Sequence, residues 1–146
     1  MKNLIIFCLS LVSFTAFAAP VSSSARLDVL KTLAEARDVK LLDHTNNKPV
    51  TYTNYKEVVV ENLDRALGGK SDKNADYSIA RLECDEVNNS TKCQVMIEIS
   101  TYSENPDVEG GMEKSESGII IDVELVKLGN GKLAIKNNQV ILAVAG

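Results

Sequence analysis

The chain has 146 residues, a formal net charge of −4 at pH 7 and 45% hydrophobic residues. A chain of this length supports one domain that buries roughly two thirds of the surface of its unfolded state, which is enough for a hydrophobic core. A mildly acidic chain without a cluster of lysines and arginines repels phosphate backbones, so we expect no nucleic-acid partner.

Residues 1–18 have the pattern of a bacterial signal peptide. Lys2 precedes an uncharged apolar block, Leu4–Val12, and the small residues of Ala16-Phe17-Ala18 stand where a signal peptidase cleaves. This block is shorter than the about 20 residues that span a bilayer, and no later segment is long and apolar enough to do so. We therefore predict cleavage before Ala19 and a mature protein that is periplasmic or secreted, without a membrane span.

The first predicted element of the mature domain, residues 19–146, is an amphipathic helix. Ser24 has the side chain of an N-cap, and the helix is predicted to run to about Val39. Its apolar face comprises Leu27, Leu30, Leu33 and Ala34, which recur at helical spacing. Turn-forming side chains fill residues 43–49, so this stretch is predicted to be a loop.

A second helix is predicted after this loop. Asn54 or Thr53 can act as its N-cap, and Glu57 stands three residues after Asn54 in a capping-box position. Its apolar stripe consists of Val59, Val60, Leu63, Ala66 and Leu67. Gly68-Gly69 supplies the left-handed stop at its C-terminus.

From Tyr77 the apolar pattern changes to the two-residue period of β-strands. Cys84 and Cys93 are the only cysteines left after the predicted cleavage, and in an oxidising compartment they are predicted to form a disulfide. If these cysteines face each other in an antiparallel pair, Leu82 lies opposite Val95 and Ala80 opposite Ile97. The bridge and the apolar face then select the same register.

The remainder of the chain predicts more strands. Residues 103–117 are predicted to be a polar loop, and residues 119–127 alternate as a third strand. Gly129-Asn130-Gly131 is a hairpin turn before a fourth strand at 132–136. Asn137-Asn138 predicts either a second turn or a bulge. Residues 140–144 are apolar on both faces, which indicates a covered or central strand.

Together these elements predict an α+β fold with two N-terminal helices packed on one face of a four- to five-stranded, mainly antiparallel sheet. The broad order of helices before a curled sheet is similar to that of cystatin-like and NTF2-like domains. No stretch of the sequence is specific enough to select a family, and architecture alone does not carry function.

His44 is the only histidine, and Asp43 beside it makes this pair the candidate general base. A solvated loop histidine is the favoured interpretation, since the sequence has no Gly-x-Ser-x-Gly motif and both mature cysteines are predicted to be bridged. Tyr52 and Tyr55 are the other candidate binding residues. They could form an exposed contact patch, although packing at the start of the second helix is favoured.

The loop at 103–117 carries the candidate calcium ligands, and Asp122 and Asn130 are possible extra donors from outside it. Asp107, Glu109 and Glu113 are oxygen donors of the kind that calcium prefers, but their spacing does not match a calcium-binding loop. A charged loop that keeps the sheet edge soluble is the favoured interpretation, so we expect no metal. Two cysteines and a single distant histidine are also a poor zinc set.

These features lead to an expected function by exclusion. The sequence contains no activated nucleophile, metal cluster or phosphate-binding loop, so we expect a non-enzymatic module that binds a protein or small-molecule ligand without a cofactor. Two other classes stay open. One is a small hydrolase or lyase that uses His44 with Asp43, and the other is a structural component of the cell envelope.

Overall fold

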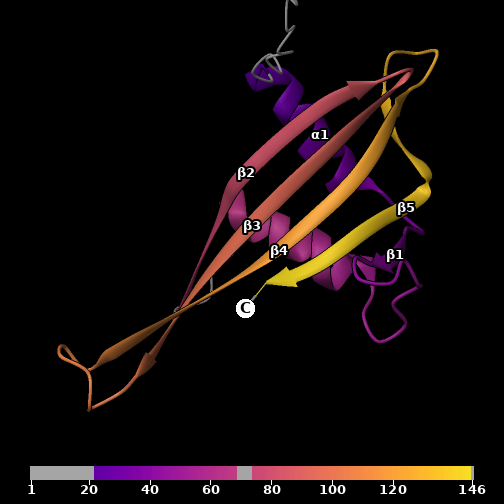
Figure 1. Cartoon of the computed structure of the whole chain (residues 1–146). Helices are drawn as coiled ribbons and strands as arrows, with labels where there is room; N and C mark the ends of the chain where they lie inside the picture. The colour runs from indigo at the N-terminus through magenta and orange to yellow at the C-terminus, as the bar shows by residue number, and fades with distance from the viewer. Residues whose placement is uncertain (1–21, 69–73, 146) are drawn as a thin grey trace, which may run out of the picture.

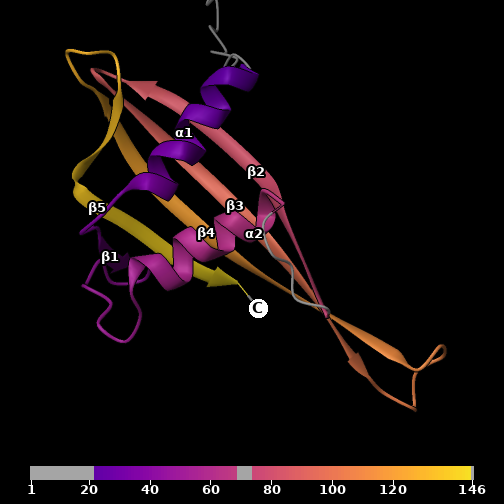
Figure 2. The same cartoon turned by 180° about the vertical axis from the view of Figure 1, so that it is seen from behind.

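The computed structural model describes residues 22–68 and 74–145, so the predicted signal peptide lies outside the described residues. It is an α+β fold in which two helical segments cover one face of a five-stranded mixed sheet (Figures 1 and 2). The strands lie in the order β1-β5-β4-β3-β2. The elements are α1 (Ser23–Glu35), β1 (Lys40–Asp43), the π-helical η1 (Lys56–Val60), α2 (Glu61–Ala66), β2 (Ala75–Val87), β3 (Ser90–Glu104), β4 (Met112–Lys127) and β5 (Leu133–Ala145).

The N-cap of helix α1 lies two residues before the predicted N-cap, and the helix ends at Glu35, before Val39. The Ser22 side chain accepts a hydrogen bond from the backbone N–H of Ala25, which makes Ser22 the N-cap. At the other end the Arg37 guanidinium donates to the carbonyls of the last turn, and Asp38 adopts a positive φ of 56°. This turn ends the helix and directs the chain into β1.

Strand β1 was not predicted: its residues 40–42 were assigned to no element, and Asp43 was placed in the predicted loop. It runs parallel to β5, with Lys40 opposite Gln139 and Asp43 opposite Leu142. Leu41 points into the core and is buried. The sheet is therefore mixed, because this one parallel pair joins an otherwise antiparallel arrangement.

The second helix starts as the sequence predicts. The Asn54 side chain accepts a hydrogen bond of 2.9 Å from the backbone N–H of Glu57. The helix opens with the π-helical η1 and continues without a break as α2. Val59 and Leu63 are fully buried against the sheet. Gly68, with a φ of 95°, follows the helix as predicted, whereas Gly69 lies outside the described residues.

Strands β2 and β3 pair in the register that the cysteines predict. Cys84 lies opposite Cys93 and Leu82 opposite Val95, and the disulfide is present. The predicted pair of Ala80 with Ile97 is wrong, because a bulge at Ala80 shifts the register and places Ile79 opposite Ile97. A bulge adds one residue to one strand and increases its local twist.

The predicted polar loop at 103–117 is wrong for most of its length. β3 continues to Glu104 and β4 begins at Met112, so only residues 105–111 form the connection. β2 pairs with β3 only as far as Thr101. Beyond that point the β3–β4 hairpin is a two-stranded ribbon that projects from the body (Figure 1). We call residues 102–114 the arm.

Strand β5 returns after the predicted turn, in which Gly131 has a φ of 82°. Residues predicted as separate fourth and fifth strands form a single strand that is interrupted by a bulge. Asn137 and Asn138 both have positive φ, and the register against β4 shifts between Val123 and Leu125. Of the two predicted alternatives at these asparagines, the bulge is correct.

The hydrophobic core lies between the helices and one face of the sheet (Figure 2). Its largest fully buried side chains are Leu33, Leu63, Ile97, Ile121, Leu125, Val59, Val95 and Val140. Successive residues of a strand point to opposite faces, so the alternate positions of the same strands form the other face. No described helix covers this second face, which we call the open face (Figure 1).

Candidate functional site

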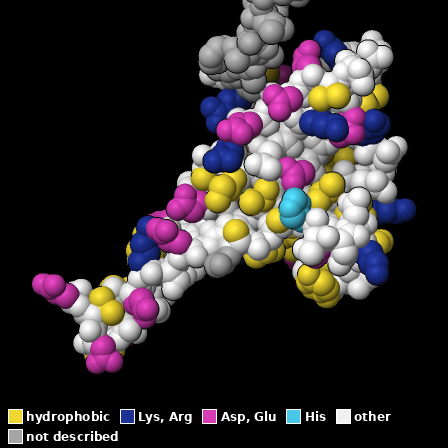
Figure 3. Space-filling view, viewed as in Figure 1, with side chains coloured by type: hydrophobic (Ala, Val, Ile, Leu, Met, Phe, Trp, Pro, Cys, Tyr) yellow, Lys and Arg dark blue, Asp and Glu magenta, His cyan; other side chains and the backbone are white. Residues whose placement is uncertain are grey.

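Two cross-strand rows of side chains form the centre of the open face. In the first row Gln94 of β3, Asp122 of β4 and Ile141 of β5 are register partners, and Leu42 of β1 extends the row. In the next row Met96 lies opposite Ile120, which lies opposite Ala143. The face thus has an apolar centre in which Asp122 is the acidic member, and Figure 3 shows hydrophobic side chains around the histidine.

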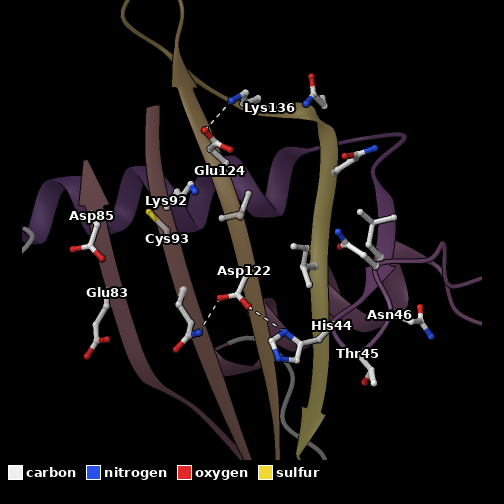
Figure 4. Close-up of a pocket in the computed structure, with 17 residues that line it drawn as sticks. His44, Thr45, Asn46, Glu83, Asp85, Lys92, Cys93, Asp122, Glu124 and Lys136 are labelled. Atoms are coloured by element: carbon white, nitrogen blue, oxygen red, sulfur yellow. Dashed lines mark hydrogen bonds and ion pairs between the residues drawn. The ribbon is translucent and has the colours of Figure 1, made fainter. Parts of the chain in front are cut away.

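A groove of about 980 Å³ runs across this face. Leu42 and Ile141 contribute apolar side chains to it, and the β1–η1 loop forms one wall with His44 and the asparagines that follow. At the opposite end the lining includes Glu83 and Asp85 of the edge strand β2 (Figure 4). A groove of this size, with an apolar base and a few converging polar groups, has the properties of a ligand site.

His44 lies at the end of β1, where its backbone N–H donates to the carbonyl of Leu142. Its imidazole Nδ1 is 3.9 Å from Oδ2 of Asp122, and 63% of the side chain is exposed. Asp43 does not share this site. Its carboxylate accepts a hydrogen bond from the backbone N–H of Thr45 and so closes the turn. The carboxylate beside the histidine therefore comes from β4 and not from the neighbouring residue.

Asp122 is the most central acidic side chain of the groove. Its Oδ1 accepts a 2.8 Å hydrogen bond from the side-chain amide of Gln94, and 31% of the side chain is exposed. Sequence reasoning assigned Asp122 only to a strand and to a possible calcium set. The β3–β4 register and the position of β1 bring it next to His44, and neither can be read from Asp122 alone.

Glu124 lies two residues after Asp122 on the same face of β4, and its carboxylate is already paired with a lysine. Lys136 donates to its carboxylate at 2.9 Å, and the hydroxyl of Ser90 donates to the same oxygen. The Ser90 hydrogen bond first, and the Lys136 ammonium second, hold the pKa of Glu124 below its usual range. The charge of Lys92 acts in the same direction. Together these groups form a locally neutralised end of the groove.

The two candidate tyrosines are not part of a shared patch. Tyr52 is 83% exposed, whereas Tyr55 is 7% exposed and belongs to the core. The Tyr55 hydroxyl donates to the carbonyl of Leu33 at 2.5 Å and so ties the second helix to α1. Burial raises the pKa of Tyr55 well above its usual range. Packing, which the sequence favoured, is therefore the role of Tyr55.

The three calcium candidates lie around the end of the arm. Asp107 and Glu109 are in the connection at 105–111, and Glu113 accepts a hydrogen bond from the side chain of Asn105. In the described ranges, 22–68 and 74–145, no three acidic, histidine or cysteine side chains lie close enough together to hold a metal ion. Within the same ranges neither helix is long and apolar enough to cross a membrane.

The disulfide lies beneath the groove. Cys84 and Cys93 face the core side of β2 and β3, and Cys93 is also among the residues that line the groove. The bridge ties the edge strand β2, which has no second neighbour in the sheet, to the central strands. It therefore holds Glu83 and Asp85 at their end of the groove.

No protein-family pattern matches the sequence, nor does any curated protein. Solved structures to which the chain is similar at a low level include the following three. A candidate ketosteroid isomerase from Shewanella frigidimarina is 14% identical, with a TM-score of 0.45 over 85% of this chain and 98% of that one. An NTF2-like superfamily protein from Salmonella enterica is 10% identical, with a TM-score of 0.39 over 83% and 84%. AclR, a candidate hydroxylase from Streptomyces galilaeus, is 9% identical, with a TM-score of 0.37 over 85% and 81%. At these levels the comparison says nothing about function.

Proposed function

We propose that the protein is an exported, non-enzymatic binding module that holds its ligand in the groove of the open face. The observation that carries this proposal is the combination of half-buried Leu42 and Ile141 with the polar groups of His44 and Asp122 in one groove. Apolar contact supplies most of the free energy of binding, and a few polar groups orient the ligand. Export is supported by the disulfide and by the signal-peptide pattern of the sequence.

The geometry around His44 favours binding over catalysis. The separation of 3.9 Å between Nδ1 and Oδ2 of Asp122 is longer than a hydrogen bond, and the imidazole is largely exposed. Both cysteines of the described chain are in the disulfide, which removes the thiol nucleophile. A base that is neither oriented by its carboxylate nor adjacent to a nucleophile lacks two parts of a hydrolytic site.

The proposal is tested by mapping a set of small organic fragments onto the protein by amide chemical shifts. We expect the shifted amides to cluster at Gln94, Asp122 and Ile141. Ile141→Glu places a charge in the apolar base and should abolish these shifts. The matched control is Leu67→Glu, which adds the same charge at an exposed leucine that directly follows α2 in the chain. Shifts that cluster elsewhere, or that persist in folded Ile141→Glu, contradict the proposal.

A small hydrolase or lyase is the second candidate, favoured by the single observation that His44 faces a carboxylate. A general base contributes about 10² to 10⁴ in rate. His44→Ala would therefore lower turnover of a substrate at least about a hundredfold if this class were correct. Under the binding proposal the same variant changes the affinity of a groove ligand by a few-fold, as contacts outside a hot spot do.

A further inference from the structure

We propose that the occupant of the groove is an extended segment of basic polypeptide, with a lysine or arginine side chain held by Asp122. This inference rests on the proposed function and names the partner of the same site. It follows from three properties of the groove: its distribution of charge, the apolar surroundings of Asp122, and its length across the sheet.

Among the acidic side chains that line the groove, Asp122 is the one available to bind a cation. Four acidic and two basic side chains line it, together with His44. Glu124 is paired with Lys136, and Lys92 contributes charge to the same end. Glu83 is an exposed side chain 3.7 Å from the guanidinium of Arg81. Within the described residues, by contrast, Asp122 accepts a hydrogen bond from the neutral amide of Gln94 and faces His44 beyond hydrogen-bond distance.

The surroundings of Asp122 strengthen its interaction with a cation. Ile141 is its direct partner on β5, and Ile120 and Met96 lie in the next row. Apolar neighbours exclude water, so a charge pair formed here is screened less than a pair on an exposed surface. The methylene stem of a lysine or arginine can lie on Ile141 and Leu42 while its charged end reaches the carboxylate.

The length of the groove indicates a polypeptide rather than a single small amine. The lining extends from Glu83 on β2 to Leu42 on β1, which is the full width of the five-stranded sheet. Four spacings between neighbouring strands amount to about 19 Å. An extended chain of about six residues has this length. Asp85, at the β2 end, lies opposite Lys92 in the β2–β3 register, so Asp122 remains the acidic group that selects the cation.

The test uses a short leucine-rich peptide with one central lysine, and the same peptide with norleucine in its place. The two differ only in the ammonium group. Titration calorimetry at low ionic strength should show that the lysine peptide binds about tenfold more tightly or better, as a charge-assisted hydrogen bond provides. Asp122→Asn should remove this difference. The control Glu86→Gln, which removes an exposed acid of β2 that does not line the groove, should keep it.

A second variant covers the case in which Asp122→Asn does not fold. Ile141→Lys places a cation beside Asp122 within the chain and should remove the preference for the lysine peptide over the norleucine peptide. Equal affinities for both peptides, with shifts confined to the groove, would overturn the cationic inference while leaving the proposed function intact. Butylammonium binding as tightly as the lysine peptide would overturn the assignment to a polypeptide.

Discussion

Tyr55 is the residue at which burial, hydrogen bonding and titration can be separated most cleanly. Its hydroxyl donates to the Leu33 carbonyl from within the core. Tyr55→Phe keeps the ring and removes the hydroxyl, which leaves that buried carbonyl without its donor. We expect the free energy of unfolding to fall by about 1 to 3 kcal/mol. Urea denaturation at neutral pH measures this loss, and a change within error would show that water replaces the hydroxyl.

Tyr55→Phe should also differ from the wild type in how its free energy of unfolding changes at high pH. Burial raises the pKa of Tyr55 in the folded state above its unfolded value of about 10. Above about pH 10 the unfolded chain therefore loses this proton first, and stability falls as the pH rises. The wild type should lose stability more steeply than Tyr55→Phe. The Asp76 carboxylate raises the pKa of Tyr102, but that contribution is the same in both proteins and cancels.

The disulfide gives a third prediction at the residue scale. The bridge between Cys84 and Cys93 closes a short ring in the β2–β3 hairpin. Replacing both cysteines with serine should lower the free energy of unfolding by about 2 to 4 kcal/mol. The fold should persist, because the apolar register partners Leu82 and Val95 remain. Thiol titration of the unfolded, unreduced wild type should detect no free thiol in residues 22–146, and two free thiols would contradict the bridge.

The contact partner of a single residue could be predicted from the sequence only where pairing between neighbouring strands determines that partner. Cys84 and Cys93 could be predicted because they flank one hairpin turn and agree with the alternation of their strands. His44 could be selected as a candidate, but its carboxylate partner could not. Asp43 is adjacent in sequence and points into its own turn, whereas Asp122 reaches the site only through the register of the whole sheet.

At the scale of elements, the bulge in β5 determines how the strand passes the groove. Asn137 and Asn138 adopt consecutive left-handed conformations, and Asn137 lines the groove. A β-branched side chain is strained in this region. Asn137→Val should lower the free energy of unfolding by about 1 to 2 kcal/mol, whereas Asn137→Gly should stay within about 1 kcal/mol of the wild type. Denaturation of both variants measures the contrast.

Gln139→Val is the matched control for the bulge, since Gln139 is an exposed residue of the same strand and is not among those with positive φ. Valine favours ordinary strand backbone, so this variant should not lose stability. Equal losses in Asn137→Val and Gln139→Val would show that the side chain, and not the backbone conformation, is responsible.

The elements that escaped sequence analysis share a physical cause. β1 has four residues, too few for an alternating pattern, and its parallel partner lies at the other end of the chain. The outer part of the β3–β4 hairpin has both faces in water, so no alternation of apolar and polar residues marks it. The helices and inner strands could be predicted because each buries only one face.

At the scale of the whole molecule, the arm and the body have separate energetics. None of the residues of the hydrophobic core lies in the arm, residues 102–114. A two-stranded hairpin without a core is only marginally stable in water. Replacing residues 103–113 with an Asn-Gly turn should therefore change the free energy of unfolding by less than about 1 kcal/mol. Urea denaturation measures this, and a loss above about 2 kcal/mol would show that the arm supports the body.

The projecting hairpin also separates charge. The segment 98–117 contains six acidic residues and one lysine, while the rest of the described chain carries 13 acidic and 12 basic residues. The acidic side chains are visible at the end of the arm in Figure 3. The molecule therefore has an electric dipole that points along its longest projection. In a field that extends about one Debye length from a charged surface, this dipole orients the protein before contact, with the arm turned away from anionic membranes.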